Sequence, residues 1–108
     1  MSVEQTDIID GLGVAADGAV EMLISDHLEW DNERHLEQLA TKIEAYAGVI
    51  ISGQLAEIYP AAEGRAVRIK LVWQHVPTAA AARVFETLEA QLRNVGIGFT
   101  QTALPSDY

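Results

Sequence analysis

The chain contains no cysteine, which excludes disulfide bonds, thiolate catalysis and zinc sites with cysteine ligands. It has no apolar run near the roughly 18 residues that cross a bilayer. It also lacks a charged start followed by a short apolar stretch, the pattern that is typical of a signal peptide. Basic residues are few, at seven against 16 acidic ones, for a net charge of −9. This balance argues against nucleic acid and anionic membranes as partners. We therefore expect a cytoplasmic protein that binds neither.

The 108 residues have the composition of one globular domain, 49% hydrophobic and 21% charged. We expect a single α+β domain over residues 1–108, with flexible ends at residues 1–6 and 104–108. The charge is uneven. Residues 1–54 hold eleven acidic and two basic side chains, whereas residues 55–108 are neutral overall. An electrostatic function would therefore belong to the first half.

The first two strands are predicted at residues 8–15 and 19–25. Asp17-Gly18 between them is typical of a two-residue type I′ turn, in which both central residues need positive φ. With that register, one sheet face carries an apolar patch of Leu12, Val14 and Leu23. Because a small domain seldom leaves such a patch in water, the pattern predicts a homodimer.

Two helices follow from apolar residues at helical spacing. Asp31 or Asn32 is expected to cap the start of the first helix, and Gly53 suits the left-handed residue after its end. Thr78 is expected to cap the second helix, and Gly96 to end it. The apolar stripes comprise Leu36, Leu39, Ala40, Ile43, Ala47, Ile50 and Ile51 on the first helix, and Ala81, Phe85, Leu88, Leu92 and Val95 on the second.

Residues 55–59 and 66–75 resemble a second hairpin, and residues 97–102 a last strand. The resulting order ββαββαβ predicts an α+β fold in which two helices pack on one face of a mainly antiparallel sheet, since each helix has one apolar stripe to bury. The residues expected in its core include Ile43, Ile50, Leu71, Trp73, Phe85 and Leu88.

A cluster of carboxylates and imidazoles at residues 25–37 is the main candidate site. The expected partner-binding residues are Asp26, His27, Glu29, Trp30, Asp31, Glu33 and Glu37. Acidic residues at a helix start also stabilise it against its dipole, so a purely structural role stays open. A metal or acid–base site is the third alternative. It lacks diagnostic spacing, because Asp31 and His35 lie four residues apart without an HExxH pattern.

Other patterns lack the context that their chemistry requires. Gly11 to Ala16 matches the G-x-G-x-x-A spacing of dinucleotide-binding loops, but a turn and a strand follow where the phosphate-binding helix should begin. None of the four serines lies in a G-x-S-x-G elbow. We therefore expect no cofactor and no catalytic nucleophile of these types.

The segment from Leu23 to Trp30, which contains Ile-Ser-Asp-His-Leu-Glu-Trp, resembles the strand end of a family of small bacterial domains of unknown function. In that family an "ISDHLxW" pattern leads into a long helix that ends in an "SGQ" step, which Ser52-Gly53-Gln54 matches here. The resemblance covers residues 7–103. It implies no activity and no site residues, and it points to residues 25–30 as the family's characteristic segment.

The interpretation favoured by these patterns is a non-enzymatic, acidic protein-binding module of immunity or adaptor type, which masks a basic surface on a partner. The alternative is a small hydrolase or metal-dependent enzyme centred on Asp26, His27 and His35. An enzyme would need these side chains to converge in a concave pocket, whereas a binding module needs an exposed, continuous acidic face.

Overall fold

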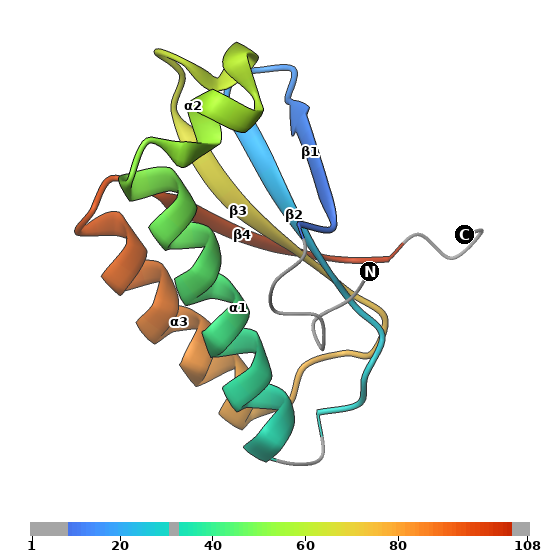
Figure 1. The fold of residues 1–108 in the computed structure, drawn as a ribbon. Helices are drawn as coiled ribbons and strands as arrows, with labels where there is room; N and C mark the ends of the chain where they lie inside the picture. The colour runs from blue at the N-terminus through green and yellow to red at the C-terminus, as the bar shows by residue number, and fades with distance from the viewer. Residues whose placement is uncertain (1–8, 31–32, 105–108) are drawn as a thin grey trace.

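The computed structural model describes residues 9–30 and 33–104, which form an α+β fold (Figure 1). In chain order the elements are β1 (Gly11–Val14), β2 (Val20–Asp26), α1 (Glu33–Ile51), α2 (Gln54–Ile58), η1 (Pro60–Ala62), β3 (Val67–Trp73), α3 (Ala79–Arg93) and β4 (Gly98–Ala103). None of the helices in the described part of the chain is long and apolar enough to cross a membrane.

The sheet is mixed, with the strand order β1-β2-β3-β4. β1 pairs with β2 in antiparallel orientation, whereas β2 with β3 and β3 with β4 are parallel pairs. The prediction of a mainly antiparallel sheet is therefore wrong. The reason is that a helix follows both β2 and β3, so that the chain returns to the same end of the sheet before each next strand begins.

Residues 55–59, predicted as a strand, lie largely within the short helix α2. Gly53 ends α1 with a φ of 83°, and the Ser52 hydroxyl accepts a hydrogen bond of 3.3 Å from the backbone N–H of Gln54 at the start of α2. Leu55 is the buried residue of α2. A single helical turn can be held in place by one buried apolar residue. A short apolar run in the sequence therefore does not distinguish such a turn from a strand.

The first hairpin has a three-residue loop rather than the predicted two-residue turn. The N–H of Ala15 donates to the Ala19 carbonyl, and Gly18 occupies the left-handed region with a φ of 88°. The register therefore shifts by one residue, which moves a strand's side chains to the other face. Leu12 now lies opposite Met22, and Val14 opposite Val20.

This register removes the apolar patch from which a homodimer was predicted. Met22 and Val20 belong to the buried core, so Leu12 and Val14 lie on the same side of the sheet as that core, and Leu23 alone faces the other way. Dimerisation stays a prediction, but the apolar patch on which it was based does not exist in this register.

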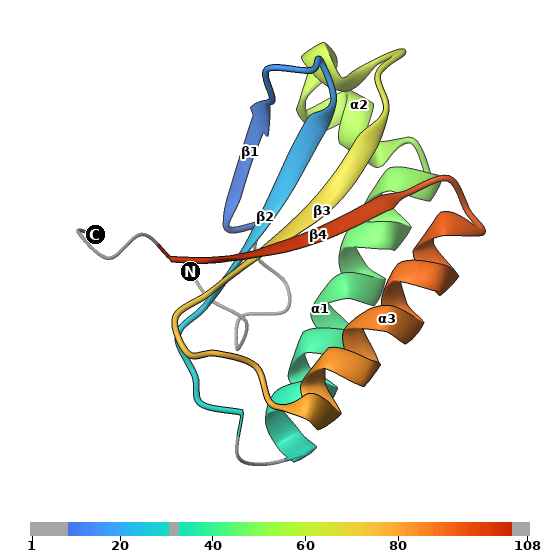
Figure 2. The same cartoon turned by 180° about the vertical axis from the view of Figure 1, so that it is seen from behind.

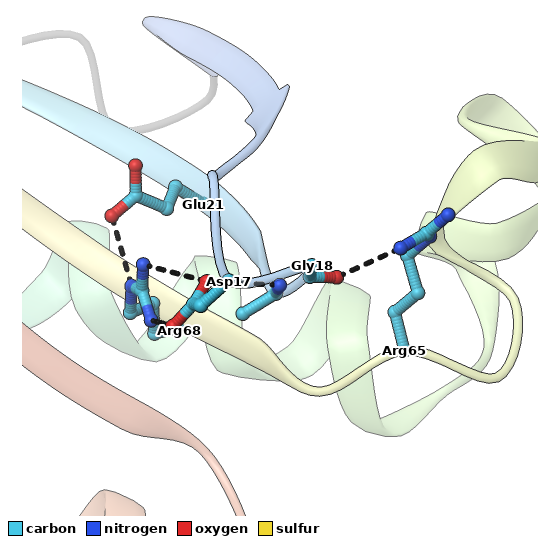
Figure 3. A network of polar contacts seen from close by, with 6 residues as sticks. Asp17, Gly18, Glu21, Arg65 and Arg68 are labelled. Carbon is cyan, nitrogen blue, oxygen red and sulfur yellow. Dashed lines mark hydrogen bonds and ion pairs between the residues drawn. The ribbon is translucent and has the colours of Figure 1, made fainter.

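An arginine cluster holds the hairpin loop against β3 (Figure 3). The Arg68 guanidinium donates to the carboxylates of Asp17 and Glu21, each at 2.8 Å, and Arg65 donates to the Gly18 carbonyl at 3.0 Å. The hydrogen bond from Arg68 lowers the pKa of the Asp17 carboxyl, and hydrogen bonds to Asp17 and Glu21 raise the pKa of Arg68. The loop conformation is thus tied to Arg68 of β3 and to Arg65, which lies just before that strand.

α1 and α3 lie side by side on the same side of the sheet (Figures 1 and 2). The core between them and the strands is built from Met22, Ile24, Leu39, Ile43, Tyr46, Ile69, Leu71, Phe85, Leu88 and Leu92, among others. Of the predicted core residues, Ile50 and Trp73 are only partly buried. Ile51 and Val95 were placed on the apolar stripes, but they are 62% and 53% exposed. Ile51 is the last residue of α1, and Val95 follows the end of α3 at Arg93.

The residues predicted to mark helix ends, Thr78, Gly53 and Gly96, are confirmed. The Thr78 hydroxyl accepts a hydrogen bond of 3.2 Å from the N–H of Ala81, as an N-cap does. Gly53 and Gly96 both adopt positive φ at the ends of their helices. The proposed caps Asp31 and Asn32 lie outside the described residues.

Candidate functional site

The candidate segment connects the end of β2 to the start of α1. Alternation along β2 turns Asp26 toward the same side as the buried residues Met22 and Ile24. His35 lies in the first turns of α1 and faces the interior. The two elements therefore bring a carboxylate and an imidazole together in the interior.

Asp26 and His35 form a buried pair. The Asp26 Oδ2 and the His35 Nε2 are 2.5 Å apart, and the two residues are 2% and 1% exposed. The other carboxylate oxygen, Oδ1, accepts a hydrogen bond of 3.1 Å from the N–H of Leu28. The His35 Nδ1 lies 2.8 Å from the backbone carbonyl of Glu29. Both ring nitrogens and both carboxylate oxygens are therefore engaged.

The partners of His35 decide where its protons lie. A carbonyl oxygen only accepts, so the Nδ1 that faces Glu29 carries a hydrogen and donates it. The short contact on the other side then holds one further proton, shared between Nε2 and the Asp26 carboxylate. Whichever atom carries that proton, the pair has no net charge. Burial of this arrangement costs far less than burial of either charge alone.

Trp30 covers this pair. Its indole stacks on the His35 ring with 4.0 Å between centroids and 16° between planes, and its Nε1 donates to the His75 carbonyl at 2.7 Å. Phe85 of α3 meets the same indole edge-on, at 5.3 Å. Trp30 therefore joins the end of β2, α1, the β3–α3 loop and α3, and it is not available as a surface contact.

A second buried pair lies further along α1, and sequence reasoning missed it. The Lys42 Nζ is 2.7 Å from the Asp10 Oδ1, and both side chains are almost completely buried. The Asp10 Oδ2 accepts a hydrogen bond of 2.8 Å from the N–H of Ser25, and so continues the pairing of β2 beyond the end of β1.

Tyr46 completes this second group. Its hydroxyl donates to the Leu23 carbonyl at 2.7 Å and accepts from the N–H of Asp10 at 2.9 Å, and burial raises its pKa. His35, Lys42 and Tyr46 are spaced seven and four residues apart, which places them on one side of α1. We call this row the polar seam. The only signal for it in the sequence is this spacing, which by itself is equally typical of a boundary between buried and exposed residues.

The exposed part of the candidate site consists of carboxylates. Glu29, Glu33 and Glu37 lie at the surface, and so does Glu44, which the sequence analysis did not include. No ion pair involves these four residues in the part of the chain that the structure describes. We call them the acidic surface. His27 is also exposed, whereas Asp26 and Trp30 are buried, and Asp31 lies outside the described residues.

The two halves of the site therefore differ in what they can do chemically. Asp26 and His35 are both buried and hydrogen-bonded inside the protein. In the described ranges 9–30 and 33–104, no group of three or more His, Asp or Glu side chains is arranged to hold a metal ion. The acidic surface is accessible, and it can meet a cationic partner.

Comparison with known proteins shows that a family model matches residues 1–104. The chain belongs to DUF6572, a family of unknown function. The resemblance found in the sequence, to a family of small domains without an assigned activity, is in accord with this match. No curated protein and no solved structure is significantly similar to the chain. For this DUF6572 member, function must therefore be argued from the site itself.

Proposed function

We propose that this protein is a non-enzymatic binding module whose acidic surface, Glu29, Glu33, Glu37 and Glu44, docks a basic protein partner. The observation that carries the proposal is the division within the candidate site. Its potential catalytic groups, Asp26 and His35, are buried and paired with each other, whereas its carboxylates are exposed and without ion-pair partners among the described residues.

Helix geometry makes the carboxylates one surface. Glu33, Glu37 and Glu44 are spaced four and seven residues apart on α1, so their side chains lie on the same side of the helix. Glu29 lies just before that helix. Arg34 is the only exposed cation within α1. A one-sided surface of this kind accelerates encounter with a cationic protein, an effect that salt weakens over the roughly 8–10 Å Debye length at physiological ionic strength.

The rigid support beneath this surface favours binding as well. The polar seam and Trp30 hold α1 against β2 and against the β3–α3 loop, so the first turns of the helix have a fixed position. A preorganised surface loses less conformational entropy when it binds. An immunity or adaptor role, in which the module masks a basic surface, is the concrete form that we propose.

The alternative enzyme, centred on Asp26, His27 and His35, has less support. General acid–base catalysis needs the catalytic group within hydrogen-bond reach of a substrate. His35 uses both ring nitrogens inside the protein, and Trp30 covers its face. Titration calorimetry with Zn²⁺ and Mn²⁺ tests this alternative directly. Micromolar binding that His27→Ala abolishes would favour the enzyme over the module.

The proposal is tested by affinity capture from the source cell's lysate on three immobilised proteins. The first is the wild type, and the second is Glu29→Lys/Glu33→Lys/Glu37→Lys. The third, Glu57→Lys/Glu63→Lys/Glu86→Lys, makes the same change in net charge at exposed residues elsewhere. We expect a basic protein that the wild type and the third protein retain at low salt, that high salt releases, and that the second protein loses. Equal retention by both variants, or no protein retained by the wild type, would contradict the proposal.

A further inference from the structure

A hollow of about 470 Å³ lies on the face of the sheet that points away from α1 and α3. β2, β3 and β4 line it with Leu23, Ser25, Lys70, Val72 and Thr102, and Asp10 borders it. Parallel sheets are normally covered on both faces. Here both long helices lie on one side of the sheet (Figure 2). The residues that line the hollow belong to the other face.

Lys70 gives the hollow its charge. The chain has two lysines, and the other one, Lys42, is buried against Asp10. Lys70 is partly buried, and among the described residues it has neither an ion pair nor a side-chain hydrogen bond. Its neighbour on the same face, Arg68, is bound to Asp17 and Glu21. In a chain with a net charge of −9, Lys70 is thus a cation that no described carboxylate neutralises.

The remaining lining residues supply hydrogen-bond donors and an apolar floor. The hydroxyls of Ser25 and Thr102 have no hydrogen-bond partner within the described part of the protein. Leu23 and Val72 together provide the apolar surface of the hollow. The Asp10 carboxylate does not oppose an incoming anion strongly, because Lys42 neutralises it at 2.7 Å and the N–H of Ser25 occupies its second oxygen.

We propose that this hollow is a binding site for a small organic monocarboxylate, with the carboxylate on Lys70, Ser25 and Thr102 and the apolar body on Leu23 and Val72. One ammonium and two hydroxyls suit a single negative charge. The volume is in the range of about 300–1,000 Å³ that is typical of small-molecule sites. The position near the carboxyl ends of the three parallel strands is also where α/β sheets commonly bind ligands.

The test is an NMR titration of the full chain with hexanoate, followed through the methyl groups of Leu23 and Val72 and the side chain of Lys70. Hexanamide, which has the same length without the charge, is the ligand control. We expect saturable shifts at these three residues with hexanoate, and binding about tenfold or more weaker with hexanamide, because a hydrogen bond to a charged group is lost. Comparable binding of both ligands, or no saturable shift with hexanoate, would overturn the proposal.

Lys70→Gln removes the charge at a side chain that has no ion pair or side-chain hydrogen bond with another described residue, and Arg83→Gln is its matched control on α3. We expect hexanoate to bind Arg83→Gln as it binds the wild type, and Lys70→Gln about tenfold or more weakly. If Lys70→Gln does not fold, Ser25→Ala, which removes only an exposed hydroxyl, takes its place, with binding about threefold weaker. Unchanged affinity in the folded variant would contradict the assignment.

Discussion

At the residue scale, two ionisable pairs are buried on the same side of α1. Asp26 with His35 and Asp10 with Lys42 each join this helix to the strand side of the fold. A pair of this kind adds little stability relative to apolar residues of the same size, but loss of one partner leaves an uncompensated buried charge. The polar seam therefore makes the position of α1 depend on a few specific side chains.

Lys42→Met tests this dependence. The substitution keeps most of the side-chain volume and leaves the Asp10 carboxylate buried without its cation, so we expect a loss of about 3–5 kcal/mol in the free energy of unfolding. Lys70→Met is the matched control, because it makes the same chemical change at a side chain that pairs with no carboxylate in residues 9–30 and 33–104, and its effect should stay within about 0.5 kcal/mol. Urea unfolding measures both. Similar small losses at the two lysines would show that the buried pair does not stabilise the fold.

The sequence indicated which segment to examine, but not what its residues do. It placed Asp26, Glu29, Glu33 and Glu37 in one candidate site, because they are neighbours along the chain. Pairing between Asp26 and His35 depends on how β2 and α1 approach each other, and this is a tertiary property. For the same reason Asp10 and Lys42, which are 32 residues apart, gave no joint signal.

At the scale of single elements, two glycines differ in whether their position requires a left-handed backbone. Gly18 closes the hairpin loop at a φ of 88°, and Gly18→Ala should destabilise the protein by about 1–2 kcal/mol. Gly48 lies inside α1, and apart from its chain neighbours and the adjacent helix backbone no atom lies within 4 Å of where a Cβ would be. Gly48→Ala should therefore stabilise the protein by about 0.5–1 kcal/mol. Thermal unfolding distinguishes the two, and effects of the same sign would contradict this account of the loop.

The hairpin loop also carries a pH dependence. The Arg68 hydrogen bond lowers the pKa of Asp17, so the stability from this contact is present above the unfolded-state pKa of Asp17 and is lost as pH falls through the lower folded-state value. In Arg68→Gln, the midpoint of the Asp17 carboxyl titration, followed by NMR, should move upward toward its ordinary value. An unchanged midpoint would show that Arg68 does not cause the shift.

The elements that were predicted correctly have local signals in the sequence. The elements that were predicted wrongly lack such signals. Thr78, Gly53 and Gly96 mark helix ends through backbone geometry that each residue provides by itself. Residues 55–59 have too little periodicity to separate one helical turn from a strand. A strand there implies a second hairpin, whereas the observed helix leaves β2 and β3 as a parallel pair connected through α1. The parallel pairing of β3 with β4 follows from α3, a helix that the sequence did predict between them.

At the scale of the whole molecule, the fold gives its surfaces different properties. The helices bury one face of the sheet and present the acidic surface to solvent, and the other face contains the hollow with Lys70. The two proposed sites therefore differ in charge and in the kind of ligand that they select, a basic protein in one case and a small carboxylate in the other. Substitution at one site should leave binding at the other unchanged.

The shared core beneath these surfaces is tested by Leu88→Ala. Leu88 is buried on α3, and its truncation should cost about 2–5 kcal/mol, through lost burial and the cavity that remains. Arg83→Ala on the exposed side of the same helix should change the free energy of unfolding by no more than about 0.5 kcal/mol. Equal effects at these two positions would contradict the packing of α3 on the sheet.

The central claim divides the candidate site into two parts. Asp26 and His35 stabilise the fold, and the exposed carboxylates of the acidic surface bind a partner. A double-mutant cycle of Asp26→Asn and His35→Gln, measured by urea unfolding, tests this most directly. We predict large losses for both single variants and an interaction energy of about 1–3 kcal/mol between them, because the two residues meet each other in the interior. Single losses within about 0.5 kcal/mol and no interaction energy would contradict the claim.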